Sequence, residues 1–177
     1  MNLKIDVQLL GEVGQCDDCP LYRLLAKVET PEPSPTIENI CFATADPEKL
    51  IAIAKCVEAS FRPRADGITP VRLTQHNSYV ALFYMFKNFG IVQPRTSVRA
   101  FVEQLGKIPF CATHVKNNFG LIVRSMQVEA INWKKGGFFV PYENLSRHFA
   151  ADCAKFIDLK ERIKALYDLM QEHHLIG

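Results

Sequence analysis

The sequence predicts a mainly helical α+β protein in three parts. A small acidic α/β part covers residues 1–75, a basic part of three helices and a β-hairpin covers 76–145, and a long C-terminal helix covers 146–177. Apolar residues recur at helical spacing through most of the second half, whereas alternating, strand-like runs are short. Charge changes sign with the same division: residues 1–75 hold 8 basic and 11 acidic residues, and residues 76–177 hold 13 and 8.

The first elements are expected to be short. Residues 3–9 alternate apolar and polar side chains, which predicts a half-buried strand, and residues 20–28 carry apolar side chains at helical spacing. Residues 30–36 hold three alternating prolines, a pattern typical of a stiff, extended connector. We therefore expect a strand and a helix, followed by a connector that leads into the next strand.

The rest of the acidic part is predicted as strand, helix and strand. Residues 37–45 form an apolar run that predicts a buried strand, and residues 68–73 predict another short one. Between them, Asp46 and Pro47 have the chemistry of an N-cap and a first helical position, and Glu48 suits the first turn. A helix should therefore start at this point and carry an apolar stripe to Phe61.

The basic part is predicted to contain three helices and a hairpin. The helices should start near Ser78, Ser97 and Thr113, each a residue type that caps helices. Two β-prone runs follow, residues 127–133 and 138–142, and the intervening residues include two glycines, which favours a β-hairpin.

The last part, from residue 146 to about 173, is predicted as a long helix. Ion pairs one turn apart, Asp158 with Arg162 and Lys164 with Asp168, should support an exposed side. This helix either packs on the core or pairs with its copy in a homodimer.

The order of three helices and a hairpin in residues 76–145 resembles the winged helix-turn-helix superfamily of DNA-binding proteins. The resemblance implies a transcriptional regulator, double-stranded DNA as partner, and a recognition helix that enters the major groove with its N-terminal end. Residues 87–135 hold 8 basic residues against Glu103 and Glu129, which suits a polyanion. The DNA-contacting residues would be Arg95, Arg99, Thr113, His114, Lys116, Asn117, Asn118 and Arg124, with Lys134 and Lys135 at the tip of the wing.

A protein-interaction or scaffold domain without nucleic-acid contacts is the alternative. Three helices and a hairpin are also a common structural module, and lysines at a hairpin tip are usually solvated. The predicted connection between the second and third helices, residues 105–112, is also longer than the turn expected of a helix-turn-helix.

Cys16 and Cys19 form a Cys-x-x-Cys pair between a predicted strand and a predicted helix, which resembles thioredoxin-like dithiol proteins. The two intervening aspartates disfavour a reactive thiolate. Zinc is the other use of this pair, but a structural site needs four ligands. Cys41, Cys56, His76, His114 and His148 could complete such a set only through the fold.

Several function classes find no support in the sequence. It contains no Gly-x-Gly-x-x-Gly, Walker or Gly-x-Ser-x-Gly motif, so we expect neither an enzyme nor a bound cofactor. No apolar run has the length of a membrane span, and no secretory signal is visible. The expected location is the cytoplasm, with reduced cysteines.

Overall fold

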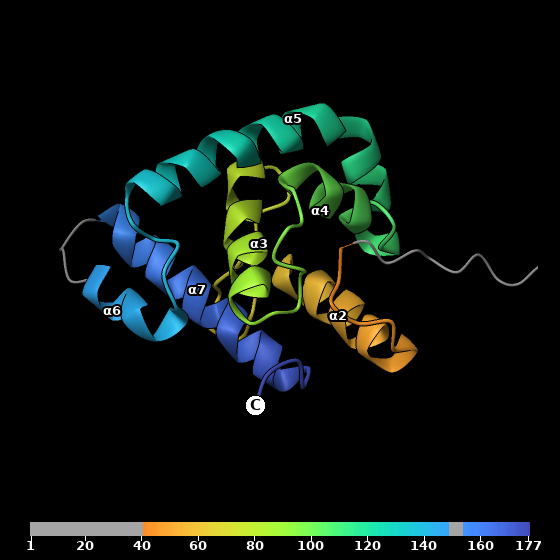
Figure 1. Ribbon diagram of the computed structural model, residues 1–177, viewed down its shortest axis with the longest axis horizontal. Helices are drawn as coiled ribbons and strands as arrows, with labels where there is room; N and C mark the ends of the chain where they lie inside the picture. Colours follow the sequence, from red (N-terminus) through yellow and green to blue (C-terminus); the bar gives the residue numbers. More distant parts are fainter. Residues whose placement is uncertain (1–40, 149–153) are drawn as a thin grey trace, which may run out of the picture. The chain divides into compact units, whose positions relative to one another are not determined.

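Apart from one isolated β-bridge, helices are the only regular secondary structure in the described part of the chain. The computed structural model describes residues 41–148 and 154–177, which belong to one unit, Asn39–Gly177. Its elements are shown in Figure 1. They are α2 (Pro47–Ser60), the 3₁₀ turn η2 (His76–Ser78), α3 (Tyr79–Asn88), α4 (Val98–Leu105), α5 (Pro109–Lys135), the 3₁₀ turn η3 (Tyr142–Asn144), α6 (Leu145–His148) and α7 (Ala154–Glu172).

The predicted α+β class is wrong, because residues 41–148 and 154–177 contain no β-strand. The described end of the run 37–45 makes only an isolated antiparallel bridge, between Phe42 and Val92. Residues 68–73, the second predicted strand of this part, are irregular, and Val71 N donates to Ser60 O at 2.9 Å. The strand predicted for residues 3–9 and the helix predicted for 20–28 lie outside the described residues.

The predicted hairpin is also wrong, since residues 127–133 are the continuation of α5. Their β propensity is overridden by packing: Trp133 is 4% exposed, and its ring lies 5.5 Å from that of Tyr84. The two glycines end the helix instead of turning a hairpin. Gly137 has φ 73°, and Phe138 N donates back to Trp133 O at 2.9 Å. Residues 138–141 then run on without regular structure.

Two helix starts are confirmed at the level of the capping side chain. Asp46 Oδ1 accepts from Glu48 N at 3.0 Å ahead of α2. Ser97 Oγ accepts from Ala100 N at 3.1 Å ahead of α4. In each case a short polar side chain satisfies an N–H that the helix itself leaves without a partner.

The third predicted helix begins earlier than expected. Pro109 takes the first turn of α5, so the connection from α4 is only residues 106–108, not the long connection predicted. A Cβ on Gly106 would lie 3.2 Å from Val115 Cγ1, so the glycine lets the two helices approach closely. The result is a short helix, a three-residue turn and a second helix of 27 residues.

The core is built around α3, which lies in the middle of the unit in Figure 1. All eight residues from Tyr79 to Phe86 are buried, so the helix is apolar on every side. It contacts both α5 and α7, and the ring centroid of Phe83 lies 5.0 Å from that of Phe101 on α4, with the rings tilted. Helix α5 runs across one end of α3, with one side directed away from the unit (Figure 1).

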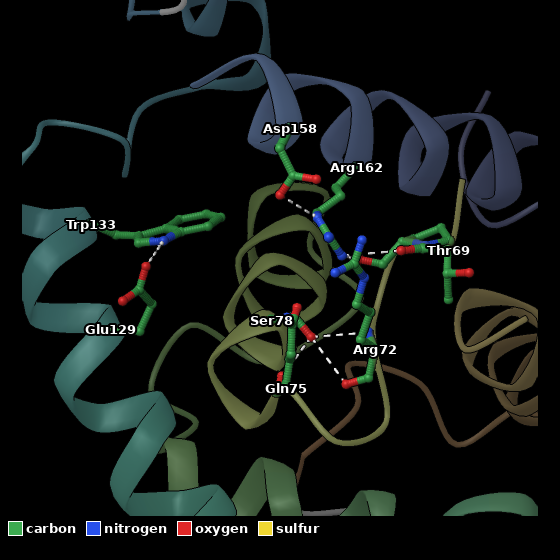
Figure 2. Close-up of polar contacts among 9 residues, drawn as sticks. Thr69, Arg72, Gln75, Ser78, Glu129, Trp133, Asp158 and Arg162 are labelled. Carbon is green, nitrogen blue, oxygen red and sulfur yellow. Dashed lines mark hydrogen bonds and ion pairs between the residues drawn. The ribbon is translucent and has the colours of Figure 1, made fainter. Parts of the chain in front are cut away.

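The predicted C-terminal helix is present as α6 and α7, with residues 149–153 outside the described residues. Helix α7 packs against α2 and α3. Arg162, 6% exposed, bonds to Asp158 Oδ2 at 2.8 Å and to Thr69 O at 3.1 Å, which fastens the 61–75 segment to α7 (Figure 2). The predicted Asp158–Arg162 pair is thus confirmed, whereas Asp168 lies 3.4 Å from Arg64.

No helix among the described residues is both long enough and apolar enough to cross a bilayer.

Candidate interaction surface on helix α5

Helix α5 has two apolar sides. The inner side is buried against the unit and consists of Cys111, Val115, Ile122, Val123, Met126 and Trp133. The outer side carries Leu121, Val128 and Ile131, whose exposed fractions are 60%, 55% and 55%. Isolated exposed aliphatic residues are ordinary, but three on one line of one helix form a patch, and such patches mark interaction sites.

The outer residues follow the spacing of a coiled-coil seam. Leu121, Val128 and Ile131 are separated by seven and three residues, and exposed Arg124 occupies the intervening seam position. Asn117 and Lys135 extend the same line at the two ends, and both are exposed. Alternating steps of three and four residues keep side chains on one face of a helix that packs against a second helix. From Asn117 to Lys135 the line is about 27 Å long.

The residues that flank the seam are small or uncharged over its middle. They are Gly120, Ser125, Gln127 and Asn132. A Cβ on Gly120 would meet nothing within 4 Å, so the surface is open at this point. At these four flanking positions a second helix therefore meets no bulky or charged side chain.

A second surface lies where α4 and α5 meet, beside the three-residue turn. It is an open groove of about 590 Å³, lined by Glu103, Gly106, Lys107, Ala112, Thr113, Val115, Lys116 and Phe119. Arg99 lies over the Phe119 ring, 5.3 Å from its centroid, and pairs with Glu103 at 3.1 Å. Three cations thus surround the groove together with one carboxylate.

The fold brings only some of the predicted DNA-contacting residues together. Arg99, Thr113 and Lys116 lie at or beside the groove, and Asn117 is exposed next to them on α5. Arg95 is exposed in the segment that precedes α4. Sequence analysis did not assign Lys107 to the site, although it stands beside the turn glycine.

The other predicted contacts are dispersed or engaged elsewhere. Lys134 lies about 27 Å along α5 from Lys116, and Lys135 and Arg124 also lie farther along the helix. Residues 127–142, all of them described, form no wing that could carry the two lysines back to the groove. Asn118 Nδ2 donates to His114 O at 3.0 Å, and the His114 ring faces His76.

His76 and His114 meet from η2 and α5. Their Nε2 atoms are 3.3 Å apart, and both side chains are half-buried. Burial lowers the pKa of His76 below its usual 6.5, and the neighbouring His114 lowers it further. A lowered pKa favours the neutral imidazole, the form that ligates metals.

The described cysteines have no features of a reactive site. Cys41, Cys56 and Cys111 are free and buried. Burial raises the pKa of Cys41 to about 11 and the pKa values of Cys56 and Cys111 to about 12. Their thiols are therefore protonated at neutral pH. Cys16 and Cys19, the dithiol and zinc candidates, lie outside the described residues.

The seam on α5 was missed because Val128 and Ile131 were assigned to a strand. Extending the helical spacing of Ile122 and Met126 to Trp133 would have placed Leu121, Val128 and Ile131 on the opposite side. That projection is the signal in the sequence that could have found them.

Comparison with known protein families, with characterised proteins and with solved structures finds no match to this chain, and so lends no support to the winged-helix resemblance.

Proposed function

We propose that this chain is a helical protein-interaction domain that associates with a second copy of itself through α5. The observation that carries the proposal is the outer seam of Leu121, Val128 and Ile131, each more than half exposed on a helix whose opposite side is buried. Burying these side chains against a partner removes apolar surface from water, the main driving force of association.

A second copy fits the seam because the seam is complementary to itself when the helices run antiparallel. In a two-fold pair, a residue that faces a second residue across the axis is faced by it in return. If the axis passes residue 126, residues equally far on either side of it face each other. Leu121 then faces Ile131 of the other copy, five residues away on each side, and Arg124 faces Val128, two residues away.

The exposed Arg124 fits the same arrangement. Arg124 can lay its aliphatic stem over Val128 of the other copy and keep its guanidinium in water. Three aliphatic side chains per copy form a narrow seam, so we expect a reversible, concentration-dependent dimer.

Size-exclusion chromatography with light scattering on the full chain tests the proposal over a wide concentration range. The chain should shift from monomer to dimer, and Ile131→Asp should stay monomeric because it places a charge in the seam. Ile51→Asp is the matched control, since Ile51 on α2 has the same type and the same 55% exposure. A wild-type chain that is monomeric at every concentration, or an Ile131→Asp dimer as strong as wild type, refutes the proposal.

Nucleic-acid binding remains a second candidate, supported by the groove between α4 and α5. The short turn, the exposed Thr113 and Asn117, and Lys107 and Lys116 beside the groove resemble a helix-turn-helix that offers the start of its second helix. We propose this function for the α4–α5 corner alone, without a wing and without Lys134 and Lys135.

Duplex DNA binding measured at several salt concentrations tests this second candidate, because phosphate contacts make affinity fall steeply with salt. Lys116→Glu should weaken binding strongly. Lys164→Glu, an equal charge change at an exposed position of α7, should reduce binding much less. Equal losses in the two variants, or no binding at low salt, would exclude the corner as a DNA site.

We also propose a reducing, cytoplasmic location, which suits the three free and buried cysteines of the described residues.

A further inference from the structure

Two histidines that are 38 residues apart in the sequence meet in the fold through their ring nitrogens. The Nε2 atoms of His76 and His114 are 3.3 Å apart, and their ring centroids lie 5.4 Å apart at an interplanar angle of 58°. Both side chains are half-buried, and no sequence spacing links them. The pair belongs neither to the α5 seam nor to the α4–α5 groove.

The loop that carries His76 is held in place by Ser78. Its hydroxyl donates to Gln75 O at 2.7 Å and accepts from Arg72 N at 3.0 Å, so it fastens both sides of the turn before η2 (Figure 2). The ring centroid of Tyr79 lies 6.2 Å from that of His76, with the two rings at 70° to each other, and Tyr79 is fully buried. His76 is therefore placed by an ordered turn that is anchored to the core.

His114 is placed by the rigid helix α5. It lies one turn after buried Cys111 and one residue before buried Val115, so its position follows from the packing of the inner side of the helix. Because the backbone of each histidine sits on a fixed element, the fold itself brings the two side chains within reach of each other.

The nitrogen separation matches chelation of a metal ion. Metal–nitrogen bonds to zinc are about 2.0–2.1 Å long in tetrahedral sites, which puts two imidazole nitrogens about 3.3–3.4 Å apart. We propose that His76 and His114 form a two-histidine site for a divalent transition-metal ion. Imidazole ligands suit zinc, nickel and copper, whereas magnesium and calcium prefer oxygen.

Binding requires a lone pair on both Nε2 atoms. Each ring must then carry its proton on Nδ1, and the proton that one Nε2 shares with the other in the metal-free pair moves to solvent or to Nδ1. His76 also borders an open hollow of about 490 Å³ together with Asn77 and Glu129, which gives the ion a path from solvent.

The site should be exchangeable, unlike a structural zinc centre. Within residues 41–148 and 154–177, no group of three or more His, Cys, Asp or Glu side chains could hold a metal ion. Two protein nitrogens leave the remaining coordination positions to water or to a small ligand. Since the histidines meet only in the folded chain, the ion should also raise thermal stability.

Equilibrium dialysis of the full chain against Ni²⁺ tests the proposal, with Mg²⁺ as the negative control. Wild type should bind one more Ni²⁺ per chain than either His76→Gln or His114→Gln. His174→Gln, at an exposed histidine near the C-terminus, should bind as wild type does. Melting temperatures provide the second readout: Ni²⁺ should raise that of wild type and His174→Gln but leave both pair variants near their own metal-free values.

The comparison separates this site from other metal ligands in the chain. Binding at Cys16 and Cys19 would leave the same number of ions on wild type and on both pair variants. That result, or a wild-type chain that binds no Ni²⁺, overturns the proposal. Retained folding of the variants is checked by their metal-free melting curves, which glutamine should alter little because it still offers hydrogen bonds.

Discussion

Replacing Ile131 by alanine should weaken the proposed dimer by a predictable amount. Ile131 is 55% exposed in the single chain. Full burial of an isoleucine side chain gains about 1.5–3 kcal/mol, so covering the exposed fraction gains roughly 1–1.5 kcal/mol, of which alanine forfeits about 1 kcal/mol. Two-fold symmetry repeats the loss, and about 2 kcal/mol corresponds to a roughly 30-fold higher dissociation constant.

Dilution calorimetry of wild type, Ile131→Ala and Ile51→Ala measures this difference. Ile51→Ala removes the same atoms from an equally exposed position on α2, so it should leave the dissociation constant unchanged. The reasoning fails if Ile131→Ala shifts the constant less than about threefold, because the expected 2 kcal/mol would then be absent. It also fails if the two alanine variants shift it equally.

Three further outcomes follow from the same structure. Arg162→Met should lower the free energy of unfolding by about 2–4 kcal/mol, because the carbonyls of residues 69–70 lose their hydrogen-bond donor. Arg99→Met, which removes an exposed ion pair with Glu103, should lower it by under about 1 kcal/mol, and equal urea midpoints for the two variants would contradict this. Arg124→Glu should weaken the dimer about fivefold, because the shorter acidic side chain covers less of Val128 of the other copy than the arginine stem does; a dissociation constant equal to that of wild type would contradict this. A thiol reagent near pH 8 should label Cys41, Cys56 and Cys111 only after the chain unfolds, as located by mass spectrometry. Rapid labelling of these three thiols in the folded chain would refute their raised pKa values.

Local capping chemistry could be predicted from the sequence because it acts within one turn. Asp46 and Ser97 bond to N–H groups two and three residues away, so their side chains alone identify the helix starts. The start of α5 was predicted too late because Thr113 was chosen as the capping residue, so Pro109 fell within the predicted connection of residues 105–112. The same residue type also suits the first turn of a helix, and a three-residue turn uses it in that way.

The hairpin prediction failed because β propensity records how a side chain fits a half-buried surface, not which surface is present. Trp133 contacts Tyr84 and Phe138 from the end of a helix, and the amino-acid sequence alone does not show that these residues are its neighbours. The histidine pair lay beyond prediction for a similar reason. Its two members come from elements that only the packing of α5 against η2 brings together.

Disulfide formation between two engineered cysteines tests the antiparallel α5 seam most directly. Leu121→Cys chains are mixed with Ile131→Cys chains under mild oxidation, and cross-linked peptides are identified by mass spectrometry. The proposed register predicts that the 121–131 link forms between different chains much faster than either 121–121 or 131–131. If the 121–121 or 131–131 disulfide forms as fast as the 121–131 disulfide, or if no disulfide forms at all, self-association in this arrangement is contradicted.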